Sequence, residues 1–153
     1  MRKRPIEQLP SDLERLGEMM ERIRKEVAVK LLKETRFSPP LPPIDTGKLA
    51  SGGAAFVGGE CVATTPQIPG SDPTPPTTSP SSDPSVISVG YSALKPAGPN
   101  ARVYMYVEGG RYFDYAIWQH LYNIQWIDSK LPLVERIVPE ATRKVMEEWM
   151  RSD

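Results

Sequence analysis

Residues 11–49 read SDLERLGEMMERIRKEVAVKLLKETRFSPPLPPIDTGKL, and this stretch joins a helical pattern to a proline-rich segment. Large apolar residues recur in its first part at intervals of three or four, which places them on one side of a helix: Leu13, Leu16, Met20, Ile23, Val27 and Leu31. Ser11 and Glu14 have the spacing of a capping box. Two prolines beginning at Pro39 prevent the helix from continuing. We therefore predict one long helix over residues 11–35.

Strand patterns follow the prolines. Ala54–Val57 and Glu60–Thr64 flank two glycines, which is typical of a β-hairpin. Val86–Tyr91 and Ala101–Glu108 alternate in side-chain character from one residue to the next. Such alternation predicts antiparallel strands with one covered face.

A second helical pattern lies near the end of the chain, with apolar residues at Val134, Ile137, Ala141, Val145 and Trp149. Pro139 either kinks this helix or begins it. The 153 residues suit a single domain. The predicted fold class is α+β, with an antiparallel β-sheet, a long N-terminal helix, a C-terminal helix and a long proline-rich loop.

That loop, residues 65–85, is inserted between two predicted strands. Ile68 is its only large apolar residue, so the segment cannot bury enough apolar surface to offset its own ordering entropy. Loops of this length in a compact domain are usually functional or disordered. We interpret the segment as an arm that contacts a neighbouring subunit through its prolines, namely Pro69, Pro73, Pro75, Pro76 and Pro80.

Composition argues against several classes of site. The charges of nineteen basic and nineteen acidic residues cancel. This balance argues against a protein that coats nucleic acid through its overall charge. Cys61 is the only cysteine and His120 the only histidine, so we predict no disulfide within the chain, no metal site and no cofactor. We expect Cys61 to be a buried strand residue. No apolar run approaches the ~20 residues that span a bilayer, and we predict no membrane partner.

Asp45, Thr46 and Gly47 form the triplet that is the signature of aspartic proteases, in which two carboxylates share a proton and activate a water. One copy per chain would require a homodimer. The context differs from that family, because prolines rather than an apolar strand precede the triplet and Lys48 follows it. A turn or helix-cap role for Asp45 is the other interpretation.

Aromatic residues gather between positions 104 and 126. Only Arg102 and Arg111 are basic between 101 and 126, whereas a base-stacking platform normally lies in a basic groove. We therefore predict that the cluster packs the core or a subunit interface. Its candidate residues are Tyr106, Tyr115, Trp118, Tyr122 and Trp126.

The string from Pro42 to Leu49 resembles the Pro-Val-Asp-Thr-Gly-x-Leu element of small neck proteins of tailed bacteriophages, the head–tail joining, tail-completion or minor tail proteins. Tyr106–Gly110 and Tyr115–His120 are similar to two further motifs of that family. The resemblance assigns an assembly or turn motif to Pro42, Pro43, Asp45, Thr46, Gly47 and Leu49.

The resemblance implies an α+β subunit without enzyme activity. It implies a homo-oligomeric ring of six or twelve copies that joins the phage head or connector to the tail and lets genomic DNA pass through its channel. The partners would be other neck, connector and tail proteins. The location would be the virion, and the host cytoplasm during assembly. The alternatives are a tail terminator that caps the tail tube and a homodimeric aspartic protease that uses Asp45.

Overall fold

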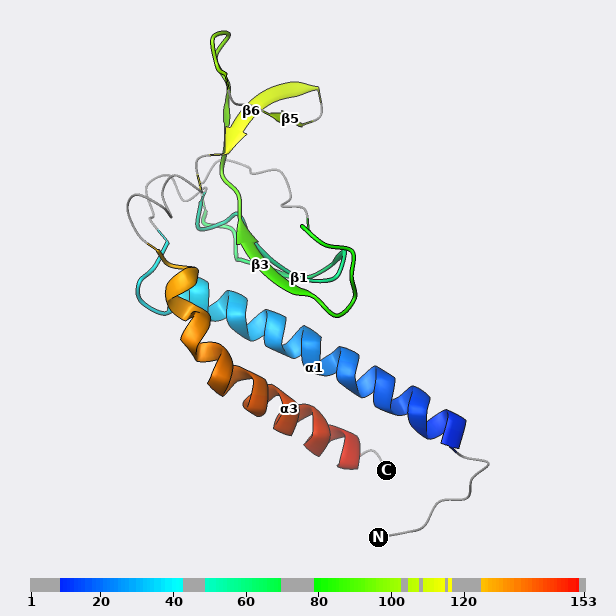
Figure 1. The fold of residues 1–153 in the computed structure, drawn as a ribbon. Helices are drawn as coiled ribbons and strands as arrows, with labels where there is room; N and C mark the ends of the chain where they lie inside the picture. The colour runs from blue at the N-terminus through cyan, green and yellow to red at the C-terminus, as the bar shows by residue number, and fades with distance from the viewer. Residues whose placement is uncertain are drawn as a thin grey trace.

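The computed structural model describes residues 9–42, 49–69, 79–102, 105–107, 109–114, 116 and 125–151. Within them, long helices are combined with two three-stranded antiparallel sheets (Figure 1), which confirms the predicted α+β fold class. The elements are α1 (Leu9–Phe37), β1 (Gly53–Val57), β2 (Glu60–Thr64), β3 (Ile87–Tyr91), β4 (Leu94–Pro96), β5 (Met105–Val107), β6 (Gly110–Asp114), the 3-10 helix η2 (Asp128–Leu133) and α3 (Val134–Arg151).

Both helices extend further than their patterns predicted. Helix α1 begins at Leu9, so Ser11 lies inside its first turn and the predicted helix start was wrong by two residues. Pro10 suits that first turn, where a missing backbone N–H costs nothing. Helix α3 begins at Val134 and continues through Pro139, which excludes the interpretation that Pro139 starts it.

The first sheet has the strand order β2-β1-β3. The predicted hairpin of β1 and β2 is confirmed, with Ala54 opposite Thr64 and a bulge after Ala55. Gly58 makes the turn at a φ of 58°, a left-handed conformation that favours glycine. Strand β3 pairs along the other edge of β1, with Val57 opposite Ile87.

This strand order explains why a long connection follows β2. Strand β2 ends beside the start of β1, whereas β3 begins beside its end, so the chain must return along the sheet. The described ends of the connection are bound to the sheet: Thr65 Oγ1 accepts from the Gly53 N–H at 3.0 Å, and the Val86 carbonyl accepts from the Gly58 N–H at 2.8 Å. The predicted arm is therefore anchored at both ends.

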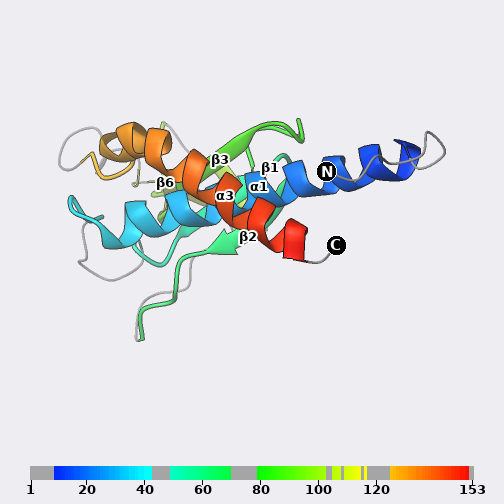
Figure 2. The ribbon, with the colours of Figure 1, turned by 90° about the horizontal axis from the view of Figure 1, so that it is seen from below.

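Helix α1 covers one face of this sheet and also packs against α3 (Figures 1 and 2). Ala28 and Leu32 belong to the core cluster that includes Ala55 of β1 and Trp126. Val27 packs instead with Ile137 and Ala141 of α3. Because full burial of a large aliphatic side chain contributes about 1.5–3 kcal/mol, these two clusters fix α1 to both of its neighbours.

The second sheet has the order β4-β6-β5 and lies beyond the first sheet, away from the helices (Figure 1). Strand β3 leads through Ser92 and Ala93 into β4. The strand predicted over Ala101–Glu108 is present as β5, Met105–Val107. Residues 101 and 102 are not part of the strand, while 103, 104 and 108 lie outside the described residues.

A buried hydroxyl pair joins α1 to β3. Thr35 Oγ1 donates to the Leu32 carbonyl at 2.7 Å, so the Tyr91 hydroxyl is left to donate to Thr35 Oγ1 at 2.8 Å. Tyr91 is also packed edge-on against Trp126, with ring centroids 5.7 Å apart. Burial raises the pKa of Tyr91 from 10.0 to about 12.

This pKa predicts a loss of stability in alkali. The folded pKa lies above the unfolded value, so the contribution is complete below pH ~10 and is lost as the pH rises toward ~12. A difference of about two pKa units corresponds to about 2–3 kcal/mol in the free energy of unfolding. We expect the free energy of unfolding, measured by urea titration, to fall less for Tyr91→Phe than for the wild type as the pH rises from 9 to ~11.5. Equal pH slopes for the two proteins would contradict this expectation.

Candidate assembly surface

One apolar face of α1 changes from buried to exposed along the helix. Val27 is 3% exposed because it packs against α3, whereas four apolar residues nearer the N-terminus of the helix are 42–59% exposed. We call this exposed set the α1 stripe: Leu9, Leu13, Leu16 and Met20. Spacings of four, three and four keep all four side chains on one side of the helix, over a length of about 16 Å.

A ladder of ion pairs sets the register between α1 and α3. Every fourth residue along this part of α1 pairs with every fourth residue along α3, counted in the opposite direction. The sign of the charge on each helix alternates from one pair to the next. The pairs are Glu34 with Arg136 at 3.2 Å, Lys30 with Glu140 at 4.0 Å, Glu26 with Lys144 at 2.5 Å, and Arg22 with Glu148. The hydrogen bond that Lys144 Nζ donates to Glu26 raises the pKa of Lys144. Exposed pairs add little stability, but alternating charges disfavour other registers.

The ladder shows where α3 stops covering α1. Its last step joins Arg22 to Glu148, so Met150 lies level with Met20. Beyond this level, the Arg15 guanidinium lies 5.2 Å from the centre of the Trp149 ring. The first turns of α1 project past the end of α3 (Figure 1). The α1 stripe is therefore a continuation of the α1–α3 interface without α3 to cover it.

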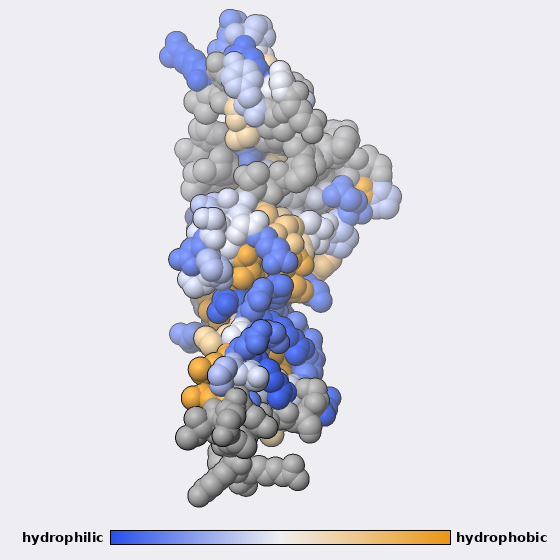
Figure 3. All heavy atoms as spheres, turned by 90° about the vertical axis from the view of Figure 1, so that its right-hand side faces the viewer, coloured by the Kyte–Doolittle hydropathy of each residue, from blue (hydrophilic) through white to orange (hydrophobic). Residues whose placement is uncertain are grey.

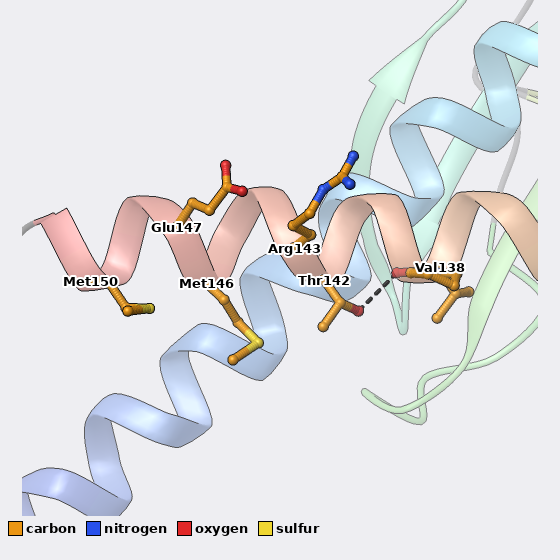
Figure 4. Close-up of a pocket in the computed structure, with 7 residues that line it drawn as sticks. Val138, Thr142, Arg143, Met146, Glu147 and Met150 are labelled. Atoms are coloured by element: carbon orange, nitrogen blue, oxygen red, sulfur yellow. Dashed lines mark hydrogen bonds between the residues drawn. The ribbon is translucent and has the colours of Figure 1, made fainter. Parts of the chain in front are cut away.

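Helix α3 carries a second exposed apolar surface, which we call the α3 groove. It is a shallow hollow of about 610 Å³, and its lining residues are Val138, Pro139, Thr142, Arg143, Met146, Glu147 and Met150. Val138, Met146 and Met150 are 39%, 42% and 66% exposed. Thr142 Oγ1 donates to the Val138 carbonyl, which removes its hydroxyl from the free polar surface. Figure 4 shows Met146, Met150 and Thr142 on one side of α3, with Glu147 and Arg143 on the other.

Other exposed apolar side chains lie at the opposite end of the molecule. Met105 and Tyr106 are 45% and 68% exposed on β5, which is an edge strand of the second sheet. Figure 3 shows hydrophobic atoms at the surface near the end where the two termini lie. Large apolar surface is thus distributed over α1, α3 and β5.

The motif from Pro42 to Leu49 is anchored in the core at both ends. Pro42 is fully buried and Leu49 is 3% exposed, while Pro43, Asp45, Thr46 and Gly47 lie outside the described residues. The approach to the motif is held by Lys130, which is 3% exposed and whose Nζ donates to the carbonyls of Pro40 and Trp126 at 2.9 and 3.0 Å.

The other predicted site residues are divided between surface, core and undescribed segments. In the arm, Pro69 and Pro80 are exposed. Trp126 is in the core at 0% exposure, but Tyr106 is exposed and contributes nothing to that core. The remaining predicted residues lie outside the described part of the chain: Pro73, Pro75, Pro76, Tyr115, Trp118 and Tyr122.

The expectation that Cys61 is buried was wrong. Cys61 is exposed because it lies on β2, the edge strand of the first sheet, opposite Phe56. In the described residues no three His, Cys, Asp or Glu side chains come together as metal ligands. The same residues contain no helix with the length and apolar character needed to cross a bilayer.

The spacing of the apolar residues places the α1 stripe on one side of the helix but does not show which part of that side is exposed. A signal was available in the lengths, because a pattern from Val134 to Trp149 cannot cover one from Leu13 to Leu31 along its full extent. Comparison with known proteins adds no family: no family model, curated protein or solved structure matches this chain.

Proposed function

We propose that this protein is a structural subunit of the head–tail neck of a tailed bacteriophage. It acts by assembling with copies of itself into a ring that joins the head or connector to the tail. The observation that supports assembly most directly is the exposure of large apolar side chains on α1, α3 and β5. Large apolar patches on a soluble protein commonly mark interaction sites.

The buried polar residues of the described chain support a structural role. Thr35, Ser51, Thr65 and Lys130 each take part in a hydrogen bond with the backbone. Each is therefore engaged in holding a helix, a strand end or a loop in place. A catalytic site needs polar groups that are presented to a substrate, whereas these four groups stabilise the fold.

The place in the neck comes from the resemblance of the Pro42–Leu49 segment to the neck-protein element, together with the α+β architecture. The arm suits such an assembly, because both of its described ends are fastened to the first sheet. A loop held in this way retains a defined origin from which it reaches a neighbouring copy. The balanced charge of the chain suits a channel through which DNA passes without being held.

Electron microscopy of the purified protein tests this function. We expect rings with a central channel, and immunogold label at the head–tail junction of virions that contain the protein. Label on the capsid surface or on tail fibres would contradict the location in the neck. Dimers that cleave peptides, with cleavage abolished in Asp45→Asn, would replace this function by the aspartic protease.

A further inference from the structure

We infer that the α1 stripe of one copy docks in the α3 groove of a neighbouring copy, so that subunits join head to tail. This inference rests on the proposed function, because it names the surfaces through which the subunits assemble. Both surfaces are apolar and exposed in the isolated chain. The stripe presents side chains at the i, i+4, i+7 and i+11 positions, the spacing with which an amphipathic helix enters an apolar groove.

The dimensions of the two surfaces agree. The stripe from Leu9 to Met20 extends about 16 Å, and the groove from Val138 to Met150 extends about 18 Å along α3. The groove includes two methionines, Met146 and Met150, whose unbranched side chains adapt to an incoming surface. A helix can therefore lie along the groove over its full length.

The stripe cannot fill the groove of its own chain. The ion-pair ladder places the groove beside the part of α1 that follows Met20. The stripe precedes Met20 on the same helix, which is continuous from Leu9 to Phe37. Since one rigid helix cannot fold back on itself, a stripe that occupies the groove comes from another copy.

Charge favours the stripe–groove contact over pairing between two stripes. The first turns of α1 carry four acidic residues, Asp12, Glu14, Glu18 and Glu21, and one basic residue, Arg15. Two such segments packed together would place like charges opposite each other. The groove instead offers one basic residue, Arg143, which forms no ion pair with another described residue, and its one acidic residue, Glu147, is paired with Arg151 at 3.9 Å. Glu14 and Glu18 are matching partners of opposite charge.

The contact is heterologous, because each copy contributes a stripe on one side and a groove on the other. Repetition of such a contact closes into a ring when the rotation between neighbours divides a full turn. A two-fold contact between identical surfaces would stop at a dimer. The asymmetry of the two surfaces is therefore what a ring subunit requires.

Two variants that each lack one surface test the inference. The stripe variant carries Leu13→Gln and Leu16→Gln, and the groove variant carries Met146→Gln and Met150→Gln. All four side chains are 42–66% exposed, so both variants are expected to fold with the wild-type circular dichroism spectrum. Leu131→Gln is the matched control, because Leu131 is 65% exposed on η2 and belongs to neither surface.

Sedimentation velocity gives the decisive readout. We expect each variant alone to raise the concentration at half-assembly by about 100-fold, since two anchors are lost, while the control assembles as the wild type. An equimolar mixture retains one intact stripe and one intact groove, and should form 1:1 dimers that grow no further.

Each other outcome overturns the inference in an identifiable way. A groove variant that assembles alone would show that stripes do not need the groove. Rings formed by both variants would place the contact elsewhere and leave the proposed function intact. A mixture that stays monomeric would exclude a direct stripe–groove contact. A wild-type chain that never assembles would contradict the proposed function as well.

Discussion

Replacement of Trp126 by alanine is expected to lower the free energy of unfolding by about 3–5 kcal/mol. The indole is 0% exposed and lies in the cluster that joins α1, β1 and β3. It also meets the Tyr91 ring edge-on at a centroid distance of 5.7 Å. Alanine would leave a cavity inside this cluster. The strands and the long helix around the cavity are rigid and cannot collapse to fill it.

Urea denaturation followed by circular dichroism measures this loss. Tyr106→Ala is the matched control, because it removes another large aromatic side chain from a position that is 68% exposed. The control is expected to change the free energy of unfolding by less than about 0.5 kcal/mol. A loss below about 1 kcal/mol for Trp126→Ala would show that the indole is not the centre of the core.

The second large effect is expected at Gly53, where even one added methyl group has no space. A Cβ atom there would lie 2.6 Å from Thr65 Cγ2 and 2.6 Å from Tyr91 Cε1. Tyr91 cannot move freely, because its hydroxyl is hydrogen-bonded to Thr35. We expect Gly53→Ala to cost about 1–3 kcal/mol through overpacking, and to weaken the anchor between Thr65 and the start of β1.

Gly90→Ala is the control for this prediction. Gly90 lies opposite Ala54 in the same sheet, but a Cβ atom there would meet nothing within 4 Å. Alanine at this position is expected to be neutral or to stabilise by about 0.4–1 kcal/mol, since it restricts the unfolded chain. Thermal unfolding should therefore rank the three proteins as Gly90→Ala, wild type and Gly53→Ala. Equal melting temperatures for the two variants would contradict the close packing at Gly53.

Periodic patterns predicted the elements of this fold well. The stripe from Leu13 to Leu31 identified α1, and the two glycines identified the hairpin of β1 and β2. The limits of the helices were less predictable, because Pro10 and Pro139 are both tolerated inside a helix here. The exposure of Cys61 could not be predicted either, because the strand pattern does not reveal which strand lies at the edge of a sheet.

The candidate surface was harder to predict than the fold. An apolar stripe has the same appearance in sequence whether a partner helix or solvent covers it, so Val27 and Leu13 could not be told apart. The distinction depends on the register between α1 and α3, which is set by long-range pairs such as Glu26 with Lys144. Those pairs are separated by most of the chain, and no local pattern connects them.

The most direct test of the account is the molar mass of the wild-type protein in solution, measured by light scattering at increasing concentration. The account predicts a closed oligomer of six or twelve copies of the 17.1 kDa chain, with no continued growth at higher concentration. A mass that remains at one copy over the whole range would contradict it, because the exposed surfaces of α1 and α3 would then have no role in assembly.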